Sequence, residues 1–274
     1  MKRTMNKFNA ALSLLVAAVL VGLTSKSIAA TDVTGTRLNV GQGHTLTGTL
    51  ATIAGGETNK ATTNYAVILG GFKNTASGFG SMIGGGLENI VTSSNAVIVG
   101  GYENTNTAHT GFIGAGYFNV NEGNFGASAI VAGYVNRNKG AFATIAGGGA
   151  NHIGTNAGAS TYGGDGMFIG AGTYNTNIAA YSFIGGGYRN YATGFGQFLG
   201  AGQKNYVDSV SGSSGMAVLM GGQENKIETY GEFAVIGGGI KNTNRASGSV
   251  ISGGSGNLVD GGEFSGIYST IGGG

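Results

Sequence analysis

The side chains that most often catalyse reactions or bind metals are few and scattered in this chain. It has three histidines, His44, His109 and His152, and no cysteine. A zinc site needs ligands at short fixed spacings, and a catalytic triad needs a base beside its orienting partner. Neither pattern surrounds these histidines, which indicates surface or turn positions for them. The sequence therefore predicts neither an enzyme nor a bound cofactor or metal ion.

Two glycine-rich patterns resemble ligand-binding motifs. Gly163-Gly164-Asp165-Gly166 resembles one unit of a calcium-binding β-roll, but that motif works as an array and the chain has only four aspartates. The glycine pairs elsewhere are not followed by the Lys-Ser/Thr of a phosphate-binding loop. We therefore interpret the glycines as structural.

Repetition is the strongest feature of the sequence. Thirteen asparagines each follow a glycine by three residues and an Ile or Leu by six, with 15 residues as the preferred spacing. We call these asparagines the asparagine ladder: Asn59, Asn74, Asn89, Asn104, Asn119, Asn136, Asn151, Asn175, Asn190, Asn205, Asn225, Asn242 and Asn257. A unit this short cannot enclose a core alone, whereas stacked copies bury a continuous one.

The units have the character of strands. Short β-branched runs such as Val67-Ile68 end at Gly-Gly or Ala-Gly, and helical spacings of three and four are missing. The prediction is an all-β protein, a parallel β-solenoid with about 15 residues per coil. Each asparagine should hydrogen-bond to the turn backbone and to the next asparagine along the rod. Fourteen coils at about 4.8 Å each would give a rod of roughly 65 Å.

The residue before each core Ile or Leu is also apolar in most units. Successive strand residues point to opposite faces, so a solenoid with one dry interior should carry a polar residue there. Strands that are apolar on both faces are buried on both. The sequence thus predicts a permanent oligomer, with three parallel rods in register as the preferred arrangement. The predicted interface residues are Val67, Val97, Phe112, Phe168, Phe183, Phe198 and Val235.

A stripe of large side chains lies two residues before the asparagines. Its members are Phe72, Leu87, Tyr102, Tyr117 and Tyr134 in five successive units, and Tyr188 in a later one. Tyrosine-rich patches bury a large area at little entropic cost, so the stripe is a candidate for receptor binding. The alternative is that the rings stack from coil to coil and only stiffen the rod.

Four gaps between ladder asparagines exceed 15 residues, those that end at Asn136, Asn175, Asn225 and Asn242. The two largest hold small and polar residues, which suits surface loops. Insertions in repeat proteins map to loops, often on the binding face. Tyr162 and Asp165, which belong to the longest insertion, are therefore further candidates for receptor binding.

The N-terminal residues have the pattern of a secretory signal peptide. Three basic residues precede an apolar run from about Ala10 to Leu23, which is short for a membrane span, and the segment Ser27-Ile28-Ala29-Ala30 follows with small residues at the expected cleavage site. Removal of this leader leaves ten basic groups against twelve acidic ones, a formal charge of −2. That balance predicts no nucleic-acid partner.

The predicted organisation is a signal peptide at 1–30, an N-terminal cap at 31–50 and solenoid repeats at 51–274. The cap is expected because a solenoid needs its first open edge covered. The last unit begins at Ser269 and stops three residues before its asparagine, so we expect the chain to be a fragment of a longer protein.

The units AVILGGFKN (66–74) and SMIGGGLEN (81–89) resemble the head repeats of trimeric autotransporter adhesins, the YadA-like family. The resemblance covers residues 51–274. It implies a left-handed parallel β-roll and a homotrimer, with a coiled-coil stalk and an outer-membrane barrel beyond Gly274. The Gly-Gly-x-x-Asn turn and the four insertions depart from the family pattern, and the sequence has no heptads or membrane strands.

The leading hypothesis is the head of a bacterial cell-surface adhesin, exported across the inner membrane and attached to the outer membrane in the full-length protein. Its partners would be copies of itself and a host receptor glycoprotein, with CEACAM-type immunoglobulin receptors as one option, or a matrix protein. A phage tail-fibre segment is the alternative, against which the leader argues. A third class is an ice-binding or carbohydrate-processing solenoid, which would need a flat threonine ladder or clustered charged groups in a groove.

Overall fold

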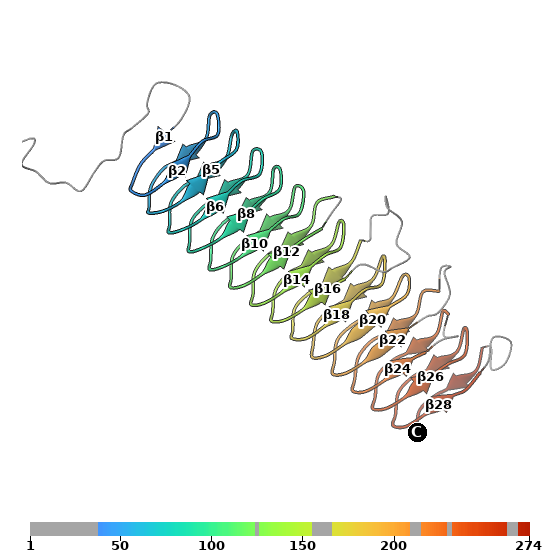
Figure 1. Ribbon diagram of the computed structural model, residues 1–274. Helices are drawn as coiled ribbons and strands as arrows, with labels where there is room; N and C mark the ends of the chain where they lie inside the picture. The colour runs from blue at the N-terminus through green and yellow to red at the C-terminus, as the bar shows by residue number, and fades with distance from the viewer. Residues whose placement is uncertain (1–37, 124–125, 155–165, 209–214, 229–231, 262–267) are drawn as a thin grey trace, which may run out of the picture.

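The computed structural model describes residues 38–123, 126–154, 166–208, 215–228, 232–261 and 268–274. In this part of the chain all regular structure is β-strand, and the coils stack into a single rod (Figure 1). The same residues include no helix of the length and apolar character needed to cross a bilayer. The predicted signal peptide, residues 1–30, lies outside the described residues.

Each coil contributes one short strand to each of two parallel sheets. The first sheet, with 15 strands among the described residues, is built from the odd-numbered strands, and each of them pairs with the next odd-numbered strand. Its members are β1 (Leu38–Asn39), β3 (Thr52–Ile53), β5 (Val67–Ile68), β7 (Met82–Ile83), β9 (Val97–Ile98), β11 (Phe112–Ile113), β13 (Ala129–Ile130), β15 (Thr144–Ile145), β17 (Phe168–Ile169), β19 (Phe183–Ile184), β21 (Phe198–Leu199), β23 (Val218–Leu219), β25 (Val235–Ile236), β27 (Val250–Ile251) and β29 (Thr270–Ile271).

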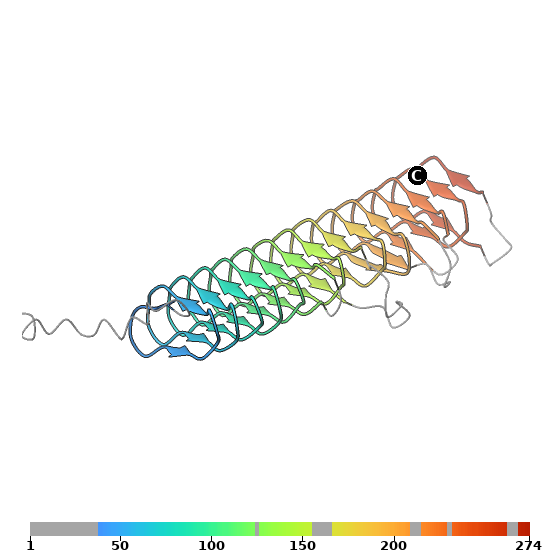
Figure 2. The same ribbon diagram turned by 90° about the horizontal axis from the view of Figure 1, so that it is seen from above.

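The second sheet has 14 strands in the described part of the chain and forms the other wall of each coil (Figure 2). Each of its strands starts directly after a ladder asparagine, except β2, which starts after His44. They are β2 (Thr45–Leu46), β4 (Lys60–Ala61), β6 (Thr75–Ala76), β8 (Ile90–Val91), β10 (Thr105–Asn106), β12 (Val120–Asn121), β14 (Arg137–Asn138), β16 (His152–Ile153), β18 (Thr176–Asn177), β20 (Tyr191–Thr193), β22 (Tyr206–Asp208), β24 (Lys226–Ile227), β26 (Thr243–Asn244) and β28 (Leu258–Val259).

The register repeats along the rod. Ile53 pairs with Ile68, and Ala61 pairs with Ala76, both at a separation of 15 residues. The predicted all-β parallel solenoid with about 15 residues per coil is therefore confirmed.

The longer gaps leave this register intact. The backbone N–H of Asn175 donates to Asn151 Oδ1 at 3.0 Å, although 24 residues separate the two. A fifth insertion precedes the last strand, since Ile251 pairs with Ile271 across 20 residues instead of 15. Asparagine spacing could not reveal this insertion because no ladder asparagine follows it. In the sequence, all five extra segments lie between an even-numbered strand and the next odd-numbered one.

The core is a single file of apolar side chains between the two sheets. The Ile or Leu at the second position of strands β3 to β27 of the first sheet is fully buried, from Ile53 to Ile251. Residues such as Val91 and Ile153 face them from the second sheet, and all belong to one continuous cluster. Burial of each such side chain is worth about 1.5–3 kcal/mol, which is the main force that holds the two walls together.

Five further asparagines replace apolar residues in the wall of the second sheet. They are Asn106, Asn121, Asn138, Asn177 and Asn244, and all are fully buried. Asn138 Nδ2 donates to the carbonyls of Ala129 at 3.1 Å and Ala143 at 2.9 Å, and Asn138 Oδ1 accepts from Gly140 N–H at 3.1 Å. These bonds tie the end of the second-sheet strand to the start of the first-sheet strands.

The described part of the predicted cap, residues 38–50, is itself a coil in register with the next one. His44 occupies its ladder position. The Nδ1 atom of His44 accepts from Asn59 N–H at 3.0 Å, and its Nε2 lies 2.9 Å from Val40 O. A neutral imidazole that carries its proton on Nε2 satisfies both contacts. This histidine therefore does the structural work of an asparagine.

Candidate binding surfaces

The asparagine ladder lies inside one corner of the rod and is buried, apart from the half-buried Asn257. Asn104 represents the pattern. Its Nδ2 donates to Gly100 O at 3.2 Å in its own coil and to Gly116 O at 2.8 Å in the next, and its Oδ1 accepts from Asn119 N–H at 3.0 Å. The amide is fully used by the backbone, so the ladder supports the fold and offers nothing to a ligand.

We predict that Asn104→Ala destabilises the rod by about 3 kcal/mol, because Gly100 O and Asn119 N–H lose their bonds to the amide, whereas Gly116 O keeps its bond from Tyr102 N–H. Gln203→Ala is the matched control, since Gln203 is exposed and lies two residues before a ladder asparagine. Urea unfolding followed by circular dichroism measures both variants. Equal midpoints for the two would refute this role of the ladder.

The structure places the predicted stripe in one column at the same corner. Consecutive β-bridges join Phe72, Leu87, Tyr102, Tyr117 and Tyr134, and the column continues through Gly149 and Thr173 to Tyr188. Side chains that are spread over 116 residues of sequence therefore follow one line along the rod. Leu87, Tyr117 and Tyr134 are exposed, whereas Phe72, Tyr102 and Tyr188 are half-buried.

Two more side chains join the stripe in its middle. Phe118 and Val135, each directly before a ladder asparagine, are exposed beside the tyrosines. The Phe118 ring centroid lies 5.2 Å from that of Tyr102 and 6.1 Å from that of Tyr134, both edge to face. We call the cluster of Tyr102, Tyr117, Phe118, Tyr134 and Val135 the aromatic corner.

The aromatic corner is held in a costly backbone conformation. Phe118 and Val135 both have a φ of 56°, in the left-handed region that β-branched residues rarely enter. The residue before every ladder asparagine has a positive φ, so this conformation belongs to the repeated turn and is not special to the aromatic corner. Both residues could have been found in the sequence by reading the position before each asparagine as well as the one before that.

A second aromatic cluster occupies the same corner further along the rod. Tyr174 and Tyr188 meet edge to face with ring centroids 6.0 Å apart. The guanidinium carbon of Arg189 lies 5.7 Å from the Tyr174 centroid and 5.0 Å from the Tyr188 centroid. This cluster already holds a cation of its own chain.

The loop candidates Tyr162 and Asp165 lie outside the described residues. The strands on either side of their insertion, β16 and β17, keep their places in the two sheets.

The outward side of the first sheet forms an apolar face. Of the predicted interface residues, Phe112, Phe183 and Phe198 are exposed on the single chain, whereas Val67, Val97, Phe168 and Val235 are half-buried. The rings of Phe168, Phe183 and Phe198 stack in a row, with centroids 5.1 and 5.2 Å apart and planes within 6° of parallel. The core Ile side chains point the other way, into the coil.

The residue after each core Ile also points outward, which sequence reasoning did not consider. Leu69, Val99, Val131 and Met220 are exposed there. Where the residue before the core position is Phe, the residue after it is glycine. A Cβ added to Gly185 would lie 3.3 Å from Phe183 Cε1, so the ring lies close over that glycine. Large and small side chains thus alternate within coils, which evens out the apolar face.

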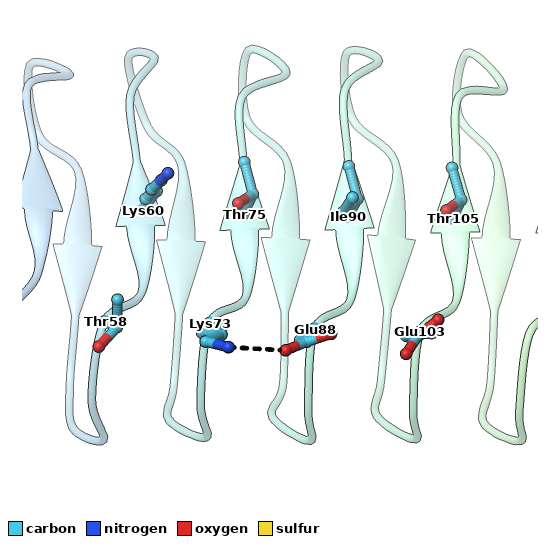
Figure 3. A pocket seen from close by; sticks show the side chains of 8 residues that line it. All are labelled: Thr58, Lys60, Lys73, Thr75, Glu88, Ile90, Glu103 and Thr105. Carbon is cyan, nitrogen blue, oxygen red and sulfur yellow. Dashed lines mark hydrogen bonds and ion pairs between the residues drawn. The ribbon is translucent and has the colours of Figure 1, made fainter.

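The outward side of the second sheet is mostly polar, with Ile90 and Leu258 as exposed apolar exceptions. A shallow groove of about 470 Å³ runs across four coils there, between residues just before and just after the ladder asparagines (Figure 3). Its lining residues are Thr58, Lys60, Lys73, Thr75, Glu88, Ile90, Glu103 and Thr105. The ammonium group of Lys73 pairs with a Glu88 carboxylate oxygen at 3.1 Å. The groove can offer hydrogen bonds and both signs of charge.

The same face carries a short column of hydroxyl side chains. Its members, in register on successive coils, are Thr47, Thr62, Ser77, Thr92 and Thr107. The column ends at Glu122, and several of its hydroxyls donate to backbone carbonyls, as Thr47 Oγ1 does to Thr62 O at 3.1 Å. The column is therefore shorter and less free than a continuous hydroxyl surface.

Five described side chains have shifted pKa values, and three of them are Tyr102, Tyr206 and His152. A hydrogen bond to Glu103, followed by desolvation and the charges of Glu103 and Glu88, raises the pKa of Tyr102. Burial and a hydrogen bond to Asp208 raise the pKa of Tyr206 to about 12. Burial, with the positive charges of Arg137 and Lys139, lowers the pKa of His152. All three groups are neutral at pH 7, so none is set up to exchange protons there.

The described residues contain no group of three or more His, Asp or Glu side chains that could hold a metal ion. Comparison of the chain with protein-family models finds no match, and comparison with curated protein sequences finds none either.

Proposed function

We propose that this chain is the head of a bacterial cell-surface adhesin, a rod without enzymatic activity or cofactor that binds a host receptor or a matrix protein. The observation that supports this proposal is the aromatic corner. Tyr117 and Tyr134 are each 57% exposed, in an apolar cluster with the exposed Phe118 and Val135. Rigid aromatic side chains on a firm scaffold make effective binding patches, because little entropy is lost when they are covered.

The working assembly in this proposal is a homotrimer of left-handed rolls, packed through the apolar face of the first sheet. The stacked phenylalanines and the alternation of large and small side chains on that face support it, because an even apolar surface suits close packing. The aromatic corner then lies on the outside of the shaft. Export by the leader and anchorage to the outer membrane through a region beyond Gly274 complete the proposal.

The test uses residues 31–274 and host cells. We expect the triple change of Tyr102, Tyr117 and Tyr134 to Ser to reduce cell binding at least about ten-fold, which corresponds to the loss of one modest binding contact. The matched control changes Tyr65, Tyr181 and Tyr268 to Ser, because these three tyrosines are exposed at a different corner. Cell binding is measured by flow cytometry, with a purified CEACAM-type receptor as the first defined partner.

Unchanged cell binding by the first triple variant would remove the aromatic corner as the site and would favour the stiffening role. Equal losses in both triple variants would show that general surface aromaticity, rather than this corner, causes attachment.

A further inference from the structure

Two aromatic clusters on the same column differ in one respect. At Tyr174 and Tyr188 the rings are covered by the guanidinium of Arg189, 5.7 and 5.0 Å from their centroids. At the aromatic corner, no Lys or Arg among the described residues lies over a ring. The rod therefore contains one filled and one open version of the same arrangement.

The charge next to the aromatic corner is negative. Of the three glutamates between Phe72 and Val135, Glu88 is paired with Lys73 and Glu122 with Arg137, whereas Glu103 forms no ion pair with a described residue. Lys73 is held by Glu88 at 3.1 Å and lies over the Phe72 ring at 5.0 Å. Glu103 directly follows Tyr102 in the chain, so its carboxylate lies beside the corner. The corner thus combines electron-rich ring faces with a carboxylate.

We propose that the aromatic corner binds a basic side chain of the partner protein, arginine above lysine, in the way that Arg189 fills the cluster at Tyr174 and Tyr188. The inference rests on the proposed function, because it specifies the chemistry of the partner at that same site. Ring faces attract cations through their quadrupoles, and a planar guanidinium stacks on rings better than an ammonium does. A neighbouring carboxylate strengthens this attraction and orients the guanidinium through hydrogen bonds.

The site also sets the spacing of its ligand. Tyr102, Tyr117 and Tyr134 lie on successive coils, which are about 4.8 Å apart. A partner segment that runs along the rod could therefore place two basic residues on neighbouring rings. Such a segment would be extended and basic, and its binding would weaken as salt is added.

The test is isothermal titration of residues 31–274 with an octa-arginine peptide, and with octa-lysine and octa-glutamate peptides for comparison. We expect octa-arginine to bind most tightly and octa-glutamate not to bind. Glu103→Gln should weaken octa-arginine binding about five-fold, and replacement of Tyr102, Tyr117 and Tyr134 by Leu at least about ten-fold, because leucine keeps apolar area but has no ring face.

Arg189→Ala gives the sharpest arm of the test, because it should turn the filled cluster into an open one. We expect this variant to bind octa-arginine at one more site per chain than the unaltered protein. The inference is overturned if the tyrosine-to-leucine variant binds octa-arginine as well as the unaltered protein does, or if Arg189→Ala adds no site.

The proposed adhesin function is tested separately, by the measurement of cell binding. Loss of cell binding in the tyrosine-to-serine variant, together with unchanged octa-arginine binding in the leucine variant, would keep the adhesin and reject the basic ligand. Unchanged cell binding in the tyrosine-to-serine variant, together with weaker octa-arginine binding in the leucine variant, would support a cation site and reject it as the site of cell attachment.

Discussion

Gly71→Ala is expected to destabilise the rod strongly, whereas Gly70→Ala at the neighbouring position is expected to change little. Gly71 has a φ of +92°, and a Cβ there would lie 2.2 Å from Gly86 O and 2.6 Å from Asn74 Nδ2. Both atoms belong to the ladder corner, so neither can move without the loss of its hydrogen bonds. We expect a cost of about 2–4 kcal/mol from strain and displaced contacts.

Gly70 is a close control for this change. It belongs to the same turn, and a Cβ added to it would meet no described heavy atom within 4 Å. Urea unfolding followed by circular dichroism compares the two variants. If both variants had the same urea midpoint as the unaltered protein, the close stacking of coils would not be the reason for glycine three residues before each asparagine. If both were equally destabilised, a general loss of turn flexibility would be the cause.

The fold could be predicted from the sequence because each coil repeats the same residue types at the same positions. A glycine that is needed for close stacking, such as Gly71, recurs three residues before every ladder asparagine, and a core residue such as Ile68 recurs six before it. The second sheet was harder to read. Its inward positions hold Ala, Val, Ile or Asn in different coils, since several side chains fit there if the asparagines can bond to the backbone.

The first coil was hidden for a similar reason. His44 lies 15 residues before Asn59 and takes the ladder position, but a search for asparagine passes over it. A side chain at the ladder position must accept a hydrogen bond from the backbone N–H of the next coil and donate one to a carbonyl. Imidazole and carboxamide both supply this acceptor and this donor. A search for asparagine alone therefore misses a histidine that makes the same hydrogen bonds.

The candidate site was predicted in part. The column from Phe72 to Tyr134 followed from spacing alone, because in-register stacking places equal positions in line. Phe118 and Val135 were missed because the predicted stripe included only the position two residues before each asparagine, whereas the position directly before it also turns outward, beside the stripe. Whether a ring face is open depends on whether a cationic side chain such as Arg189 folds over it. The spacing of residues in the sequence does not determine this.

The double change Phe183→Glu and Phe198→Glu is expected to abolish self-association while the coil stays folded. These rings are 37% and 41% exposed on the single chain and point away from the core Ile residues, so their loss should not open the interior. If the apolar face packs against other copies, the change removes about 1–2 kcal/mol of apolar burial per chain, since only about two fifths of each ring is left to bury, and it places carboxylates in a dry interface. That should weaken assembly by more than about a hundred-fold.

Sedimentation equilibrium and circular dichroism separate the two parts of this prediction. Phe79→Glu is the matched control, because Phe79 is 50% exposed and lies outside the odd-numbered strands of the first sheet. The unaltered protein and Phe79→Glu should sediment as trimers, and the double variant as a monomer with an unaltered β-sheet spectrum. A soluble monomer of the unaltered protein would contradict the assembly, and would leave the stacked rings as a surface for some other partner. A trimeric double variant would place the interface on a different face of the rod, since two charges per chain could not be buried between sheets without a cation to pair with them.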